Sequence, residues 1–185
     1  MKKILNCTIA ALIALALLAG MAFAEAPQTF LTVAEDCAVR VAPDPEGDAL
    51  IDAKADAQLA FQLKAVLDEN NALWYSVLCD GEDGWIAAEY AELVGTEDGY
   101  AITVENVGLI EATGGDSFIR AKADREAEIV GQLNLGEFGI YGGDSFVDYR
   151  GVRWDCIEFE GSDGVEHIGW ISSMYTSPKA LNAEA

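Results

Sequence analysis

The sequence is poor in basic residues and in histidine. Its 185 residues include 11 Lys and Arg against 32 Asp and Glu, which gives a net charge of −21, and His167 is its single histidine. A surface of this charge repels other polyanions, so nucleic acid, anionic lipid and teichoic-type polymers are poor partners on charge alone. The same acidity also keeps an exported protein soluble. The sequence shows no glycine-rich phosphate loop and no Ser-His-Asp pattern, and we expect neither a cofactor nor a metal.

Long hydrophobic runs are also scarce, and the clearest one lies at the N-terminus. Lys2 and Lys3 precede the apolar run Thr8–Leu18, which ends at the small-x-small site Ala22-Phe23-Ala24. The run is short for a membrane span, and its flanks are typical of a secretory signal. We therefore expect residues 1–24 to be a cleaved signal peptide. After cleavage no stable membrane span is expected, and the protein is secreted or held in the cell envelope.

The remaining chain contains one hairpin pattern twice. Trp74 begins an alternating run that turns at an Asp-Gly-rich segment and returns through Trp85, and the run from Trp154 to Trp170 repeats it. Trp74 and Trp154 are 80 residues apart, whereas Trp85 and Trp170 are 85 residues apart. The extra five residues therefore fall in the hairpin tip of the second copy, where insertions cost little. Two matching pairs at nearly one offset indicate an internal duplication.

Each copy is predicted to consist of short strands. Composition alone would favour a helix over residues 49–67, but the equivalent segment 128–141 is rich in Ile, Val and Gly. We therefore predict strand–turn–strand in both, with Asp56 and Gly136 at the turns because both tolerate a left-handed backbone. Ala87–Tyr90 is predicted as a short helical turn. About five short strands per copy indicate an all-β fold of two small β-barrels.

The ordered landmarks resemble those of the bacterial SH3-like (SH3b) domain family. The first copy has Val39-Arg40, Trp74-Tyr75-Ser76-Val77, Gly84-Trp85-Ile86 and Tyr90, and the second has Ile119-Arg120, Trp154-Asp155-Cys156-Ile157, Gly169-Trp170-Ile171 and Tyr175. The resemblance implies two tandem SH3-like barrels at residues 25–95 and 107–177, with a linker at 96–106 and a tail at 178–185.

Proteins similar to this family are exported binding modules, often joined to cell-wall hydrolases. The resemblance therefore implies a non-enzymatic protein that recognises cell-wall (peptidoglycan) peptides or another envelope protein. The alternative is a protein–protein interaction or inhibitor module without cell-wall affinity. A third alternative is a small cysteine-dependent enzyme.

Three cysteines remain after signal cleavage. Strand alternation places Cys37 and Cys79 on inward faces of one barrel, and export permits a disulfide between them. The alternative is two buried free thiols. Cys156 shares the outward face of Trp154, so we expect it to be a free thiol that is able to join two copies of the protein.

Two further groups of residues, Cys156 with His167 and the acidic turns, have both a functional and an ordinary interpretation. A thiol nucleophile needs its base within hydrogen-bond reach, and strand alternation turns Cys156 and His167 away from each other. An ordinary exposed or half-buried histidine is therefore favoured. The acidic turns 44–48 and 80–84 contain oxygen ligands that calcium prefers, but Asp and Gly are also the residues that tight turns require.

Aromatic side chains are the remaining candidates for a binding site. We expect Trp74 and Trp154 on the outer faces of their strands, where rings beside acidic groups suit an extended peptide. The alternative is that these rings cover a small core or the contact between the two copies. The six candidate groove residues are Trp74, Trp85, Tyr90, Trp154, Trp170 and Tyr175.

Overall fold

The computed structural model describes residues 28–180, and these residues form an all-β protein. Strands make up 57% of them and helical turns 4%, which confirms the predicted fold class. The predicted signal peptide, residues 1–24, lies outside the described residues. Among residues 28–180 no helix is long and apolar enough to cross a membrane.

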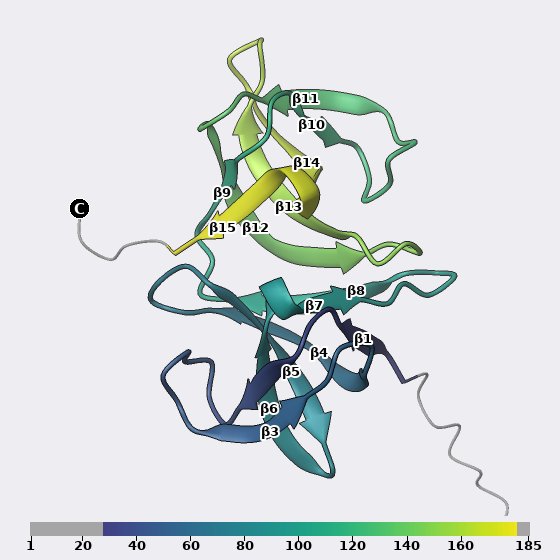
Figure 1. Ribbon diagram of the computed structural model, residues 1–185. Helices are drawn as coiled ribbons and strands as arrows, with labels where there is room; N and C mark the ends of the chain where they lie inside the picture. The colour runs from purple at the N-terminus through teal and green to yellow at the C-terminus, as the bar shows by residue number, and fades with distance from the viewer. Residues whose placement is uncertain (1–27, 181–185) are drawn as a thin grey trace, which may run out of the picture.

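The chain folds into two units with a strand between them (Figure 1). The first unit contains β1 (Phe30–Val33), β2 (Cys37–Arg40), β3 (Ala49–Ala53), β4 (Gln58–Leu67), β5 (Leu73–Cys79), β6 (Glu82–Ala87), the 3-10 turn η1 (Ala88–Tyr90) and β7 (Ala91–Leu93). Then comes β8 (Tyr100–Glu105). The second unit contains β9 (Leu109–Ala112), β10 (Ser117–Arg120), β11 (Ile129–Leu133), β12 (Phe138–Val147), β13 (Arg153–Glu160), β14 (Glu166–Ser172), the 3-10 turn η2 (Ser173–Tyr175) and β15 (Thr176–Lys179).

The two units have the same strand pairing. In the first, β4, β5, β6, β2 and β3 are successive neighbours, and in the second β12, β13, β14, β10 and β11 take the same order. β1 and β7 extend the first unit from β4, as β9 and β15 extend the second from β12. The repeated order is the structural counterpart of the sequence repeat.

The predicted closed barrels are not formed. The described strands make one open 15-stranded sheet. In the part of the chain that the structure describes, β3 pairs only with β2 and β7 only with β1. The strand ladder of the first unit therefore has two free ends, and the same holds for β11 and β15 of the second.

The turns predicted from the repeat are present. Asp56 separates β3 from β4 with φ of 64°, and Gly136 separates β11 from β12 with φ of 81°. These positive values explain why Asp and Gly stand at equivalent positions. The helix that propensity alone would favour over residues 49–67 is absent, and η1 confirms the short helical turn.

Residues 96–106, expected to be a linker, contain a strand that pairs with both units. β8 runs parallel to β4, with Lys64 opposite Thr103, and antiparallel to β12, with Ser145 opposite Ile102. Its inward side chains Ile102 and Val104 are buried. The backbone ladder therefore continues from one unit into the other through β8.

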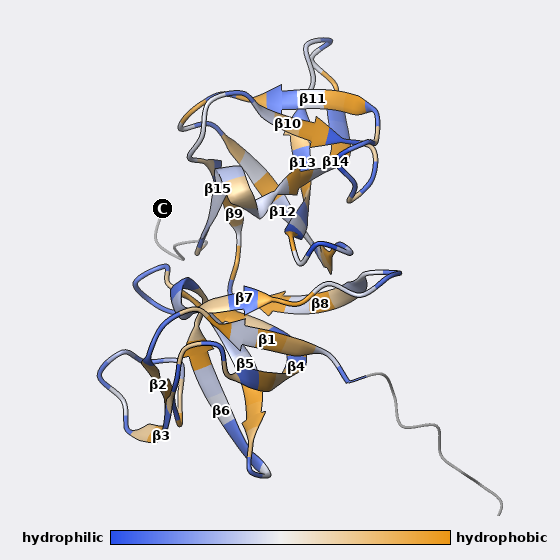
Figure 2. Cartoon of the chain, turned by 45° about the vertical axis from the view of Figure 1, so that its right-hand side comes forward, coloured by the Kyte–Doolittle hydropathy of each residue, from blue (hydrophilic) through white to orange (hydrophobic). Residues whose placement is uncertain are grey.

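Each unit has an apolar core, and the core of the first unit extends into the contact between the units. It includes Val39, Phe61, Tyr75, Val77 and Ile86, together with β8 and Val147 of β12. The second core is built from Ile110, Ile119, Leu133, Ile157, Phe159 and Ile171. Figure 2 shows the apolar residues along the strands and polar residues at the tip of the β5–β6 hairpin.

Candidate functional site

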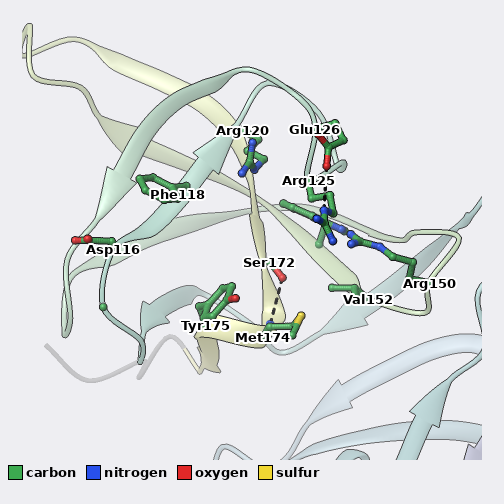
Figure 3. Close-up of a pocket in the computed structure, with 12 residues that line it drawn as sticks. Asp116, Phe118, Arg120, Arg125, Glu126, Arg150, Val152, Ser172, Met174 and Tyr175 are labelled. Carbon is green, nitrogen blue, oxygen red and sulfur yellow. Dashed lines mark hydrogen bonds and ion pairs between the residues drawn. The ribbon is translucent and has the colours of Figure 1, made fainter.

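Each unit has a surface pocket, and these two pockets lie at equivalent places. The first has a volume of about 560 Å³ and the second about 780 Å³. Each lies between the loop after β2 or β10, the turn before β5 or β13, and the 3-10 turn. Equivalent positions that line both are Asp36 and Asp116, Arg40 and Arg120, Trp74 and Trp154, Ala87 and Ser172, and Tyr90 and Tyr175. Figure 3 shows the second pocket.

A buried tryptophan borders each pocket. Trp74 is 4% exposed and Trp154 3%, so the expectation that both rings stand on an open outer face is wrong. Each indole Nε1 donates a hydrogen bond to an aspartate six residues earlier: Trp74 to Asp68 Oδ2 at 3.0 Å, and Trp154 to Asp148 Oδ2 at 3.1 Å. The turn that carries each aspartate folds over the outer face of the strand, which explains the burial.

The same aspartates also hold the turns themselves. Asp68 Oδ1 accepts the backbone N–H groups of Asn70 and Ala72, and Asp148 Oδ1 accepts those of Arg150 and Val152. Each carboxylate therefore fixes one wall of its pocket and the tryptophan beside it. A carboxylate that accepts several hydrogen bonds is stabilised in its charged form.

The electrostatics of Asp148 follow from these contacts. Burial acts to raise the pKa of this carboxyl, but hydrogen bonds from Arg150, from Trp154 and from the backbone outweigh it, so the pKa is lowered. The Arg150 Nη2 lies 2.8 Å from Asp148 Oδ2. Asp148 therefore stays ionised beneath the second pocket.

Trp74 packs with its cross-strand neighbours in a small cluster of its own. It lies opposite Val66 on β4 and Ala87 on β6, and all three are buried. Trp85 and Tyr90 pack against this cluster while half-buried. The rings therefore cover the outer face of the sheet, as the alternative interpretation held, and Trp74 also lines the pocket.

The tyrosines supply the accessible aromatic surface. Tyr90 ends η1 and is half-buried, whereas Tyr175 ends η2 and is 51% exposed. The charge of the adjacent Glu89 raises the pKa of Tyr90. Trp85 and Trp170 do not line either pocket, so four of the six candidate aromatic residues come together, two in each pocket.

An arginine in each unit holds the loop that forms the opposite wall. Arg40 Nη1 donates to the Gly47 carbonyl at 2.6 Å, and Arg120 Nη1 donates to the Ala127 carbonyl at 2.7 Å. The Val-Arg landmark of the sequence therefore supplies one core residue and one arginine that fixes a loop at the pocket.

The predicted disulfide between Cys37 and Cys79 is not formed, and both residues are free thiols. Both lie on the core side, as expected, but at opposite ends of the sheet. Arg40 lies opposite Trp85 and Cys79 opposite Glu82 on the same β6. Continuing the register places Cys37 six residues from Cys79 along the strand direction, or about 20 Å, whereas a disulfide requires Cα atoms within about 7 Å.

Cys156 is a free thiol, but it is not open to solvent as expected. It is 8% exposed, because the irregular part of β12 near Gly142 covers it. Burial raises the pKa of its thiol. A bond from Cys156 to a second copy would require this thiol to become exposed.

The partner of His167 is Asp163 and not Cys156. His167 is exposed, and its Nε2 lies 3.1 Å from Asp163 Oδ1. The hydrogen bonds found among residues 28–180 include none between His167 and Cys156. Within the same residues no group of three or more His, Cys, Asp or Glu side chains is placed to hold a metal ion.

Sequence reasoning missed two sets of residues. Asp68 and Asp148 precede their tryptophans by six residues in both copies, so the repeat alignment carried a signal for them. The buried pair Arg153 and Asp155 gave no such signal, because the first unit has Leu73 and Tyr75 at those positions.

Comparison with known proteins gives little similarity. No protein-family model matches the chain, and no curated protein matches it. Two similar solved structures are both of Ly7917, one of them determined with "the hydrolyzing product of MDP". They share 14% and 12% sequence identity with this chain, cover 82% of it in each case, and superpose with a TM-score of 0.31. The chain covers 62% and 61% of their lengths.

These neighbours bear on one expectation from the sequence. The prediction of a non-enzymatic protein is contradicted, since the solved structures similar to the chain include one obtained with the product of a hydrolysis. A TM-score of 0.31 assigns neither a fold nor an activity to this chain.

Proposed function

We propose that the protein is an exported, tandem SH3b-like protein whose two pockets bind extended peptides of the cell wall. The observation that supports this is the repetition of the pocket itself. Both units place a tryptophan, a tyrosine and an arginine at equivalent positions around a hollow. The repeat therefore extends beyond the two cores to positions that line the pockets, among them Tyr90 and Tyr175.

The lining suits a peptide for physical reasons. Tyrosine rings offer a flat apolar face and a polar tip, and the neighbouring arginines and carboxylates offer hydrogen bonds to backbone and charged groups. The buried tryptophan and its aspartate keep two of the walls fixed, which lowers the entropy lost on binding.

Cosedimentation of the mature chain with purified peptidoglycan tests the proposal. Tyr90→Ala and Tyr175→Ala remove one wall each, so we expect each to weaken binding several-fold and the double variant by more than tenfold. Because Tyr90 also packs against the Trp74 cluster, the melting temperature of each variant is measured beside its binding. Phe138→Ala is the matched control, since Phe138 is 50% exposed and lies outside both pockets. Full binding by the double tyrosine variant would contradict the proposal.

Tryptophan variants are less suitable for this test. Truncating a buried aromatic residue costs about 3–5 kcal/mol of stability, so Trp74→Ala and Trp154→Ala would lose binding through unfolding. Tyr175→Ala separates binding from stability best, because Tyr175 is an exposed side chain.

A second candidate, a protein–protein module of the envelope, is favoured by an apolar patch on the second unit. Ile140 on β12 and Ile168 on β14 flank Glu158 across the sheet, and they are 54% and 68% exposed. Nearby Phe138 projects from the same face of β12 as Ile140. If this patch carries the function, Ile140→Ser with Ile168→Ser abolishes capture of an envelope protein, while the tyrosine variants retain it.

A further inference from the structure

The two pockets lie at equivalent places but differ in charge. Four carboxylates and one arginine line the first pocket, whereas three arginines and two carboxylates line the second. The first set is Glu35, Asp36, Arg40, Asp68 and Glu89. The second is Asp116, Arg120, Arg125, Glu126 and Arg150. If Asp148 beneath the second pocket is counted like Asp68, the formal charges are −3 and 0.

The difference arises from substitutions at equivalent positions. Arg150 of the second pocket stands where the first has Asn70, and Arg125 stands where it has Pro45. Met174 of the second pocket replaces the charge of Glu89. Each of these changes makes the second pocket more positive than the first.

The arginines lie at the accessible part of the second pocket. Figure 3 shows Arg125 and Arg150 reaching toward each other from two different loops at its rim. Arg125 donates through Nε to Glu126 at 3.0 Å, and Arg150 donates through Nη2 to Asp148 at 2.8 Å. A guanidinium has five N–H donors, so both keep donors for a further acceptor. The side chain of Asp148, by contrast, is only 6% exposed.

We infer that the second pocket binds the carboxylate of a peptide, while the first excludes it and accepts an ammonium group. This rests on the proposed peptide binding. Arg125 and Arg150 stand on two loops of the same pocket, and each keeps N–H groups that are able to donate to a carboxylate oxygen. The first pocket has Asn70 and Pro45 at these two positions, and the carboxylates elsewhere in its lining attract ammonium groups and repel a carboxylate.

The strongly acidic chain does not prevent this selectivity. Salt screens charges beyond about 8 Å at physiological ionic strength, so the distant acidic surface contributes little to the field that one small anion meets beside the arginines at the rim. A long polyanion would extend past the rim and meet the acidic surface. The second pocket is therefore suited to a single carboxylate on an otherwise neutral peptide.

The indole N–H signals of the intact mature chain in NMR spectra can report each pocket separately, since Trp154 lines the second and Trp74 the first. We expect N-acetyl-alanyl-alanine, which has a free carboxylate, to shift the Trp154 signal and leave Trp74 unchanged. Its C-terminal amide should bind at least tenfold more weakly. Alanyl-alanine amide, which carries only an ammonium charge, should shift Trp74 instead.

Variants identify the residues responsible. Arg125→Gln, at a side chain that is 62% exposed, should weaken carboxylate binding several-fold without unfolding the chain, and Arg150→Gln about tenfold. Asn70→Gln is the matched control in the first pocket. Asn70→Arg combined with Pro45→Arg should bring carboxylate binding to the first pocket.

Equal shifts by the acid and its amide, or equal responses of Trp74 and Trp154 to the acid, would overturn the inference. If cosedimentation with peptidoglycan persists in that case, peptide binding stands and only the charge selectivity fails. If neither peptide nor peptidoglycan binds, the proposed function fails first, and the inference with it.

Discussion

Arg153 and Asp155 form an ion pair that is buried at the contact between the two units. Arg153 Nε lies 3.0 Å from Asp155 Oδ1, and the side chains are 5% and 2% exposed. Burial acts to lower the pKa of Arg153, but Asp155 and the Tyr75 hydroxyl of the first unit raise it. Asp155 also accepts a hydrogen bond from Ser145 at 2.7 Å. Tyr75 and Asp155 are equivalent positions of the repeat, and both lie beside one guanidinium.

The first prediction concerns this pair. Arg153→Met or Asp155→Asn leaves one buried group without its partner, so each should lower the free energy of unfolding by about 3–5 kcal/mol. The double variant removes both charges and should cost clearly less than the sum of the two. Urea unfolding of the four proteins measures this difference. Additive losses would show that the two residues act independently.

The second prediction concerns the pH dependence of Asp148. Its lowered pKa means that its stabilising effect is fully present above about pH 4, the unfolded value, and is lost as the pH falls through the folded pKa. Asp148→Asn should therefore destabilise the chain by about 2 kcal/mol at pH 7 and by less at pH 2.5. Unfolding at both pH values tests this, with Asp98→Asn as an exposed control. An equal loss of stability at both pH values would show that protonation of Asp148 is not linked to folding.

The third prediction concerns Gly151, which has φ of 80° in the turn before β13. A Cβ at this position would collide with the carbonyl oxygen of Leu93 in the first unit. Gly151→Asn tolerates the backbone angle but adds the Cβ, so it should cost about 1–3 kcal/mol, or several degrees in melting temperature.

The equivalent residue of the first unit supplies the control for that variant. Asn71 has φ of 61°, and its Oδ1 accepts the backbone N–H of Ala180 at 2.8 Å. Asn71→Gly should change stability by at most about 1 kcal/mol. Gly151→Asn with unchanged stability would contradict the close contact between Gly151 and Leu93.

The fourth prediction concerns the cysteines. Mass spectrometry of the mature chain, alkylated in urea without a reductant, should show Cys37, Cys79 and Cys156 all modified. The melting temperature should not depend on the reductant, since the structure holds no disulfide between them. In the folded chain Cys156 should react slowly, because it is buried and its pKa is raised. If Cys37 and Cys79 both stayed unmodified, they would form the disulfide predicted from the sequence.

The repeat was the part of the fold that the sequence showed most clearly. Asp56 and Gly136 were correctly placed at turns because their equivalence outweighed the helix propensity of the segment before β5. Strand alternation also placed Cys79 on the core side correctly. These are local properties, set by backbone conformation and by the two-residue period of a strand.

The errors concern contacts that alternation does not describe. Trp74 does face the outer side of its strand, but the turn with Asp68 covers that side. The thiols of Cys37 and Cys79 share a core, but the register of β2 on β6 separates them along the strands. The register between strands and the burial of a strand face by a loop depend on the whole sheet, so neither can be predicted from the sequence of one strand.

The pairing of β8 with both units has a consequence for avidity. Because β4 and β12 share this strand as a common neighbour, the spacing of the two pockets is fixed rather than set by a flexible tether. A polymer that displays many short side branches can engage both pockets only where two branches match that spacing. If both pockets bind as proposed, β8 makes the molecule selective for the distance between two branches, and a cross-linked polymer with that spacing is bound more tightly than the same branches free in solution.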